Sequence, residues 1–194
     1  MRRAGATTVE AEPSTVVILV YARHHRATDG ILSTVHFSQM GSNTGHVVRL
    51  EFASVFEMLD CVQVVSDYLG RSVGLDEDDR HWVSVAVRES VINAIKHGNR
   101  NDASKHVHVD FETSSNGVPQ ISIRVRDEGD GFDPEEVADP LAPENLLKAS
   151  GRGIFLIRNF MENVLVQRAP EGGMEIRMTK RAQAGDPEKP SPGA

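Results

Sequence analysis

Three shortages mark this 194-residue sequence: it has one cysteine, no long apolar run near its N-terminus and fewer basic than acidic residues. The single Cys61 excludes an internal disulfide framework, which suits a reducing compartment and predicts a cytoplasmic protein. The longest apolar run near the N-terminus, residues 16–21, is much too short to span a bilayer. Glu10 and Glu12 precede it where a secretory signal would be basic, so we expect neither export nor a membrane partner.

Acidic residues outnumber basic ones, 28 to 21, and give the chain a net charge of -7. A chain with this balance has no basic field that could track a nucleic-acid backbone or an anionic membrane surface. We therefore expect no direct contact with nucleic acid. The hydrophobic content of 39% is sufficient for one sizeable core in a chain of this length, which predicts a single domain with tails.

Sequence patterns divide the chain into three parts. Residues 1–45 mix Ser, Thr, Gly and His without sustained periodicity, so we interpret them as an N-terminal extension of uncertain structure, in which Met40 is an alternative start. Residues 182–194 are rich in Pro, Gly and charge, which predicts a disordered tail. Residues 46–181 lie between these segments and form the predicted domain.

Periodic patterns within residues 46–181 predict helices packed on one face of a mainly antiparallel, mixed sheet. Alternating apolar residues indicate strands at residues 46–52, 105–112, 121–127, 163–168 and 174–180. One helix is expected after Ser54, which forms a capping-box pattern with Glu57, and a second helix from an Asp76 N-cap to Gly98. This order predicts an α+β two-layer sandwich within the broad α/β class.

The second predicted helix carries Glu89, Asn93 and His97 among apolar residues. Glu89 and Asn93 stand four residues apart on one helical face, and burial of a carboxylate without a basic partner costs on the order of several kcal/mol. This cost favours a functional role for the pair, with a Glu that faces water as the alternative. His97 directly precedes Gly98, where a donor helps to end a helix, so helix termination competes with ligand contact.

The end of a predicted strand and the turn after it form the next candidate site. The period-two pattern of residues 121–125 continues to Asp127 and points it toward the core, where a ligand contact or a plain turn role would suit it. Gly129 and Gly131 let the backbone turn sharply and approach a ligand without an intervening side chain.

Gly151 and Gly153 open the last predicted helix. Free backbone amides and the positive end of the helix dipole suit an anion at such a start, although simple turn chemistry produces the same pattern. The preceding residues 132–150 contain three prolines and little regular pattern, which predicts a mobile, lid-like loop.

The order of the motifs RESVINAIKHGN, DEGDGFDP and SGRGIFLIRNFM resembles that of the ATP-binding domain of the GHKL superfamily, which has the Bergerat fold. Within that superfamily, residues 46–181 most resemble the anti-sigma factor serine kinases, which are compact bacterial regulators of the partner-switching kind. The resemblance implies ATP and Mg2+ as cofactors. It also implies a sigma factor and an anti-sigma factor antagonist as protein partners, and it is compatible with a homodimer.

The resemblance assigns a role to each polar residue. Glu89 would act as the catalytic general base or would orient the acceptor hydroxyl. Asn93 would bind Mg2+ through its side-chain oxygen, a hard ligand that suits this ion. Asp127 would accept a hydrogen bond from the adenine amino group at the dry bottom of the pocket.

The glycines and Arg152 have implied roles as well. Gly129 and Gly131 would shape the adenine wall, whereas the amides around Gly151, Arg152 and Gly153 would hold the phosphates. Phosphoryl transfer needs mainly positioning and charge neutralisation, so this sparse set of groups is chemically sufficient. The Arg152 side chain would add a phosphate contact or remain solvated.

One position departs from the family pattern. The family commonly has a threonine just after the glycine of the last hairpin, where this chain has Met174. The missing hydroxyl predicts a lower nucleotide affinity, unless Thr179 or a water molecule substitutes for it.

Three functions are compatible with these motifs. The first is an ATP-dependent protein-serine kinase that acts as an anti-sigma factor and phosphorylates an anti-sigma factor antagonist. The second is a catalytically weak ATP-binding switch that sequesters a regulatory partner, and the presence of Glu89 favours the kinase over it. The third, a fragment of a histidine kinase, is disfavoured because the upstream histidines lie in no amphipathic dimerisation helix.

Overall fold

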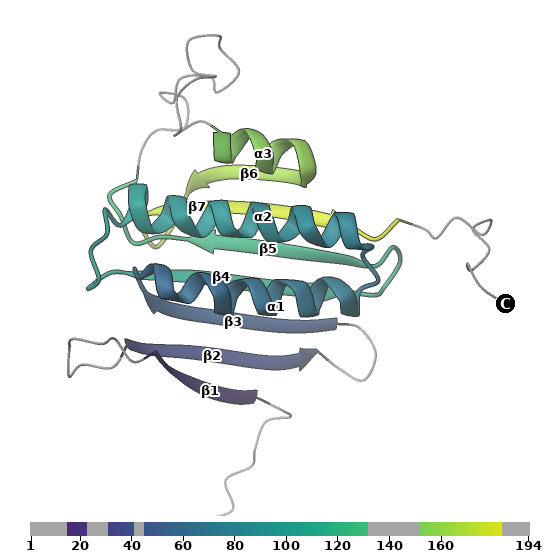
Figure 1. The fold of residues 1–194 in the computed structure, drawn as a ribbon, viewed down its shortest axis with the longest axis horizontal. Helices are drawn as coiled ribbons and strands as arrows, with labels where there is room; N and C mark the ends of the chain where they lie inside the picture. Colours follow the sequence, from purple (N-terminus) through teal and green to yellow (C-terminus); the bar gives the residue numbers. More distant parts are fainter. Residues whose placement is uncertain (1–14, 23–30, 41–44, 132–151, 184–194) are drawn as a thin grey trace, which may run out of the picture.

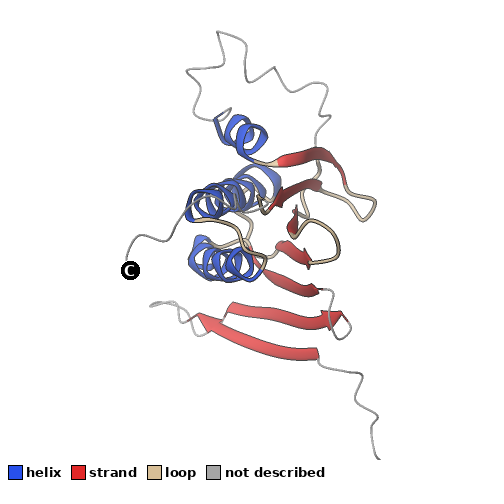
Figure 2. Ribbon diagram, turned by 90° about the vertical axis from the view of Figure 1, so that its right-hand side faces the viewer, coloured by secondary structure: helices blue, strands red, loops and turns tan. Residues whose placement is uncertain are grey.

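Strands and helices form two separate layers in the computed structural model, which describes residues 15–22, 31–40, 45–131 and 152–183. The seven strands have the order β1-β2-β3-β4-β5-β7-β6, and every pairing among them is antiparallel. The helices cover one face of this sheet (Figure 1, Figure 2). The predicted two-layer sandwich is therefore confirmed. The predicted lid and most of the predicted tail lie outside the described residues.

The strands are β1 (Thr15–Ala22), β2 (Ile31–Met40), β3 (Gly45–Ala53), β4 (His106–Ser114), β5 (Gln120–Arg126), β6 (Glu162–Arg168) and β7 (Met174–Arg181). The helices are α1 (Leu59–Ser72), α2 (Glu77–Asn93) and α3 (Arg152–Phe160). A 3-10 turn, η1 (Phe56–Met58), precedes α1, and a π-helical turn, η2 (Ala94–Gly98), continues α2.

β1 and β2 lie in the N-terminal region for which the sequence predicted no definite structure. β1 pairs with β2 along its whole length, and β2 pairs with β3, so the sheet continues on the N-terminal side of residue 46. The mixed Ser, Thr and His content of residues 31–40 hides the strand pattern. Strand formation depends strongly on neighbouring strands, which a local pattern does not reveal.

The core lies between the sheet and the helices. β3, β4 and β5 bury alternate side chains, as predicted, and this pattern points one face of each strand at the helices. Side chains with no exposed surface include Phe52, Leu69, Val91, Ile95, Phe111 and Ile121. Burial of each such side chain stabilises the fold by about 1.5–3 kcal/mol.

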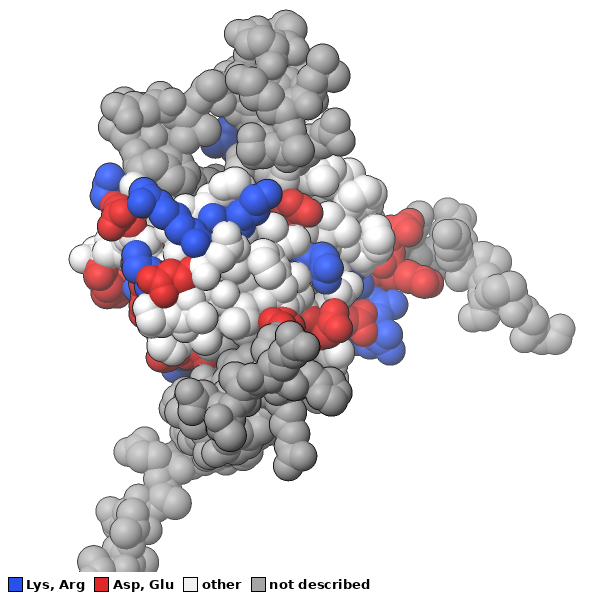
Figure 3. All heavy atoms as spheres, turned by 60° about the vertical axis from the view of Figure 1, so that its left-hand side comes forward, with Lys and Arg blue, Asp and Glu red and all other residues white. Residues whose placement is uncertain are grey.

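The outer surface carries charges of both signs. Figure 3 shows basic and acidic side chains near one another on one face of the molecule. None of the helices in the described ranges combines the length and hydropathy that a bilayer crossing requires.

The start of α2 matches the sequence prediction, whereas the start of α1 does not. Asp76 caps α2, because its side chain accepts a hydrogen bond from Asp79 N at 2.7 Å. Neither η1 nor α1 has a side-chain cap. The capping-box prediction for Ser54 is wrong, because Val55 and Met58 occupy the cap positions of η1 and α1. The Ser54 hydroxyl donates to the Lys105 carbonyl oxygen at 2.9 Å.

The end of α3 is fixed to α2 and β7. The Phe160 ring stacks on Trp82, with ring centroids 3.4 Å apart and an interplanar angle of 3°. Lys180 Nζ donates to the Phe160 carbonyl oxygen at 3.3 Å and lies 2.8 Å from Asp79 Oδ1 in a mostly buried ion pair. These contacts hold the C-terminal end of α3 against α2 and β7.

Candidate functional site

A cavity of about 270 Å³ opens between α2, α3 and the adjoining ends of β5 and β7. Its lining residues are Ser90, Asn93, Ala94, His97, Gly98, Val125, Asp127, Ile154, Val166, Met174 and Ile176. Most of these are apolar, with a few polar groups, which is the usual composition of a small-molecule site. The fold thus brings together Asn93, His97 and Asp127, which the sequence singled out from separate motifs.

Asp127 directly follows β5, and its side chain is buried, with 4% of the residue exposed. Its Oδ1 accepts hydrogen bonds from Gly129 N at 2.9 Å and Met174 N at 3.1 Å, and its N–H donates to the Met174 carbonyl oxygen at 3.0 Å. Burial raises the pKa of the Asp127 carboxyl, while the two backbone hydrogen bonds oppose this rise by favouring the charged form. Among the described residues none donates to Oδ2, the second oxygen of this carboxylate.

Three glycines allow the backbone to approach Asp127 closely. A Cβ on Gly98 would lie 2.2 Å from Asp127 Cγ, and a Cβ on Gly173 would lie 1.9 Å from the Asp127 carbonyl oxygen. A Cβ on Gly129 would lie 2.1 Å from the Gly98 carbonyl oxygen, so the turn after Asp127 packs directly on the end of η2. The sequence pattern indicated a helix stop at Gly98 and a turn at Gly173. It could not reveal these contacts, because residues far apart in the chain make them.

Gly131 is placed differently from Gly129. It has a positive φ of 70°, and a Cβ there would lie 2.9 Å from Arg168 Nη1. The same Arg168 nitrogen donates to the Asp130 carbonyl oxygen at 2.9 Å. Gly131 therefore supports the turn beside the cavity, and neither Gly131 nor Gly129 is among the residues that line it.

Glu89 and Asn93 face the first turn of α3. A Cβ on Gly153 would lie 2.7 Å from Glu89 Oε2 and 3.4 Å from Asn93 Nδ2, so α3 begins directly against both side chains. Glu89 is partly buried, and its side chain has neither an ion pair nor a hydrogen bond within the described residues. Gly151 and the Arg152 side chain lie outside the described part of the chain.

The segments that form this site lie within a region that matches a known family. Residues 57–180 match the family described as "Histidine kinase-like ATPase domain". The chain belongs to the histidine kinase-like ATPase family. Its motifs therefore lie in an ATPase domain, and this membership implies ATP as the ligand of the site.

Several curated relatives of this histidine kinase-like ATPase carry regulatory names. The anti-sigma F factor of Oceanobacillus iheyensis is 35% identical over 138 residues, which cover 69% of this chain and 91% of that protein. The anti-sigma F factor of Bacillus velezensis is 36% identical over 137 residues, which cover 69% of this chain and 90% of that protein. The serine-protein kinase RsbW of Staphylococcus aureus is 35% identical over 140 residues, which cover 69% of this chain and 85% of that protein.

The residues at the start of α3 fit a metal ion that is carried by a nucleotide. Mg2+ takes oxygen ligands, retains several waters and shares phosphate oxygens, so few protein groups are needed. Within the described ranges no cluster of three His, Cys, Asp or Glu side chains could hold a metal by itself. The Asn93 side-chain amide, whose Nδ2 would lie 3.4 Å from a Cβ on Gly153, also carries an oxygen of the hard kind that such an ion prefers.

Met174 occupies the position at which the histidine kinase-like ATPases commonly have a threonine. Its backbone N–H and carbonyl oxygen both bond to Asp127, and the residue also lines the cavity. Thr179 lies an odd number of residues after Met174 on β7, and such residues point to opposite faces of a sheet. Thr179 pairs with Ser122 and lines a separate cavity. The suggestion that Thr179 supplies the missing hydroxyl is therefore wrong.

Proposed function

We propose that this histidine kinase-like ATPase is an ATP-dependent protein-serine kinase that acts as an anti-sigma factor and phosphorylates an anti-sigma factor antagonist. The observation that carries the proposal is the position of Glu89, a partly buried carboxylate beside Asn93 and against the start of α3. A base at this point suits proton transfer during phosphoryl transfer. The relatives named anti-sigma F factor and serine-protein kinase support the substrate class.

Each group of residues has one task in this proposal. Glu89 accepts the proton of the acceptor serine or orients its hydroxyl. Asn93 holds the Mg2+ that accompanies ATP. Asp127 accepts a hydrogen bond from the adenine amino group through Oδ2. Backbone amides of residues 151–153 bind the phosphates, and residues 129–131 form the turn that shapes the adenine wall.

The remaining assignments follow from the sequence and the resemblance. We propose a cytoplasmic location, which the single cysteine supports. A homodimer stays a prediction. The division into an extension (1–45), an ATPase domain (46–181) and a tail (182–194) also stays a prediction, with the addition that β1 and β2 extend the sheet of the domain.

A catalytically weak switch is the second candidate function. Met174 favours it, because this position has an apolar side chain in place of the hydroxyl that would contact ATP near the adenine. Such a switch would bind ATP and sequester a sigma factor without transferring phosphate. It would not depend on the carboxylate of Glu89.

The decisive experiment compares Glu89→Gln with Glu77→Gln, a matched control at an exposed Glu in the first turn of the same helix. With labelled ATP and a purified antagonist encoded in the same operon, Glu89→Gln should lose phosphotransfer by about 10²-fold or more but retain ATP and sigma-factor binding. Glu77→Gln should transfer phosphate as wild type does. If wild type transfers nothing and Glu89→Gln sequesters the sigma factor normally, the switch is the function.

Asn93→Ala tests the metal assignment separately. We expect it to weaken ATP binding in the presence of Mg2+, because water must fill the lost ligand position. Calorimetry in a metal chelator should then show equal affinities for wild type and Asn93→Ala. A loss of affinity that is the same with and without Mg2+ would contradict a metal-binding role.

A further inference from the structure

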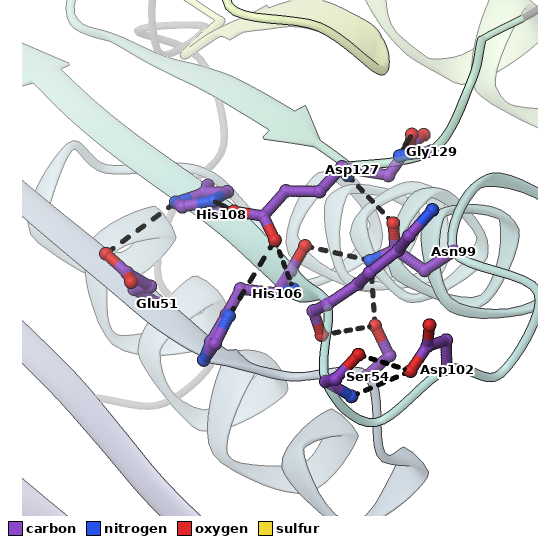
Figure 4. Close-up of polar contacts among 11 residues, drawn as sticks. Glu51, Ser54, Asn99, Asp102, His106, His108, Asp127 and Gly129 are labelled. Atoms are coloured by element: carbon purple, nitrogen blue, oxygen red, sulfur yellow. Dashed lines mark hydrogen bonds and ion pairs between the residues drawn. The ribbon is translucent and has the colours of Figure 1, made fainter.

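Asn99 follows η2 directly, is 1% exposed and makes three hydrogen bonds through its side-chain amide. Its Nδ2 donates to Ser54 Oγ at 2.7 Å and to the His106 carbonyl oxygen at 2.8 Å. Its Oδ1 accepts from Glu128 N at 2.8 Å. Figure 4 shows Asn99 between Ser54 and the turn that begins at Asp127. One amide therefore connects the end of α2 with segments next to β3, β4 and β5.

The Glu128 N–H that Asn99 holds lies immediately after Asp127. Asp127 is bonded to the Met174 backbone in β7, which holds it from the other side. The Asn99 amide thus holds the backbone on the C-terminal side of Asp127. Because Gly98 precedes Asn99, the same tie keeps the close contact between Gly98 and the Asp127 carboxylate.

The Glu128 side chain adds a second tie to the same turn. Its Oε2 accepts a hydrogen bond from His106 N at 2.8 Å, and its Oε1 lies 2.9 Å from His108 Nε2. The turn is therefore anchored to β4 by its side chain and to the end of α2 by its backbone. Neither Asn99 nor Glu128 lines the cavity, so both act on a ligand only through Asp127.

We propose that Asn99 is a positioning residue for adenine recognition: its amide fixes the Glu128 N–H and thereby places the Asp127 carboxylate in the cavity. The inference rests on the proposed role of Asp127 in reading the adenine amino group. An amide is required because the position needs two donated hydrogen bonds and one accepted hydrogen bond. Alanine supplies none of these bonds, and an ionised aspartate supplies acceptors only.

The test compares Asn99→Ala with Thr113→Val, a matched control. Thr113 is also buried, and its Oγ1 accepts a hydrogen bond from His46 N at 2.8 Å, at the opposite end of β4 from His106. Calorimetry with ATP and with GTP should show that Asn99→Ala binds ATP about 10-fold more weakly and loses preference for ATP over GTP, as expected for one misplaced hydrogen bond. Thr113→Val should lower stability without changing that preference.

The outcomes separate this inference from the proposed function. If Asp127→Asn weakens ATP binding but folded Asn99→Ala keeps the wild-type preference for ATP over GTP, Asn99 has only a structural role. If Asp127→Asn binds ATP as wild type does, the adenine assignment fails, and the role of Asn99 fails with it. Should Asn99→Ala not fold, Ser54→Ala removes one of the three bonds and should reduce the same preference by a smaller factor. An unchanged preference in Ser54→Ala would then overturn the inference.

Discussion

The two ends of α2 differ in what their side chains contact. Near the N-terminal end, Asp79 pairs with Lys180 and Trp82 stacks on α3. Toward the C-terminal end, the side chains of Glu89 and Asn93 make no hydrogen bond with the described residues and face the start of α3. One end of the helix is bound to the rest of the protein, whereas the other presents two polar side chains toward the start of α3, where we propose that the ligand binds. Changes at the first end should therefore affect stability, and changes at the second should affect binding.

Lys180→Met should have the largest effect on stability and little effect on binding. It leaves the carboxylate of Asp79 buried without a cation, and Asp79 Oδ2 already has no hydrogen-bond partner within the described residues. Removing one partner of a buried ion pair costs about 3 kcal/mol or more of unfolding free energy. Urea denaturation should show this loss, and calorimetry on the folded protein should show an ATP affinity within about twofold of wild type. Equal losses of stability and affinity would contradict the division between the two ends.

Gly98→Ala should mainly weaken ATP binding, whereas Lys180→Met should mainly lower stability. In an ordinary helix this change stabilises by up to about 1 kcal/mol. Here the new Cβ would lie 2.2 Å from Asp127 Cγ, so the carboxylate must move. We expect a loss of ATP affinity of about 30-fold, or about 2 kcal/mol.

Gly70→Ala in α1 is the matched control for Gly98→Ala. Its Cβ would lie 3.1 Å from Cγ of Arg80, a residue that does not line the cavity. ATP affinity should stay at the wild-type value in Gly70→Ala. A Gly98→Ala protein that binds ATP equally well would show that Asp127 does not need its present position.

Met174→Thr should have a smaller effect and should raise affinity. The backbone bonds of residue 174 to Asp127 do not depend on the side chain, whereas the new hydroxyl can bond in the cavity. A hydrogen bond of about 1 kcal/mol corresponds to about fivefold tighter ATP binding. Met174→Val has the same branched shape without the hydroxyl and separates the two causes. Equal affinities of Met174→Thr and Met174→Val would exclude a role for the hydroxyl.

The smallest expected effect is a pH dependence at Glu128. Burial raises the pKa of Glu128, but hydrogen bonds from the His106 N–H and from His108 outweigh burial and lower the pKa below its ordinary value. A carboxyl with a lowered pKa in the folded state stabilises the protein above the unfolded pKa, about 4.3 for Glu, and loses this contribution as the pH falls through the folded pKa.

The comparison of wild type with Glu128→Gln isolates this contribution. The difference between their unfolding free energies should be largest above about pH 4.3 and should disappear in more acidic solution. Denaturation at a series of pH values measures this difference in unfolding free energy directly. A difference that grows as the pH falls would contradict a lowered pKa for Glu128.

The sequence could predict features that repeat locally. Period-two alternation identified β3, β4 and β5, and the Asp76 cap placed the start of α2 correctly. Helical spacing predicted that Glu89 and Asn93 share a face, and the structure places both against Gly153. Glycines in the three sequence motifs also indicated, from local sequence alone, where helices and turns begin or end.

The contacts that the sequence missed join residues far apart in the chain. Asn99 bonds to Ser54, which is 45 residues away, and this contact redirects the hydroxyl that the local pattern assigned to a helix cap. Gly173 meets Asp127 only because β7 pairs with β5. Amide and hydroxyl groups fit many partners equally well, so their sequence neighbourhood does not specify which one they contact.

The stacking of Trp82 on Phe160 gives the protein an intrinsic fluorescent probe of the position of α3. The chain has a single tryptophan, so its fluorescence comes from one known place. That indole lies on the last residue of α3, and the same helix begins against Glu89 and Asn93. Any displacement of α3 that accompanies nucleotide binding changes the distance between the two rings and hence the emission. Rapid-mixing fluorescence of the unlabelled protein therefore tests, in real time and without a partner present, whether nucleotide binding moves α3.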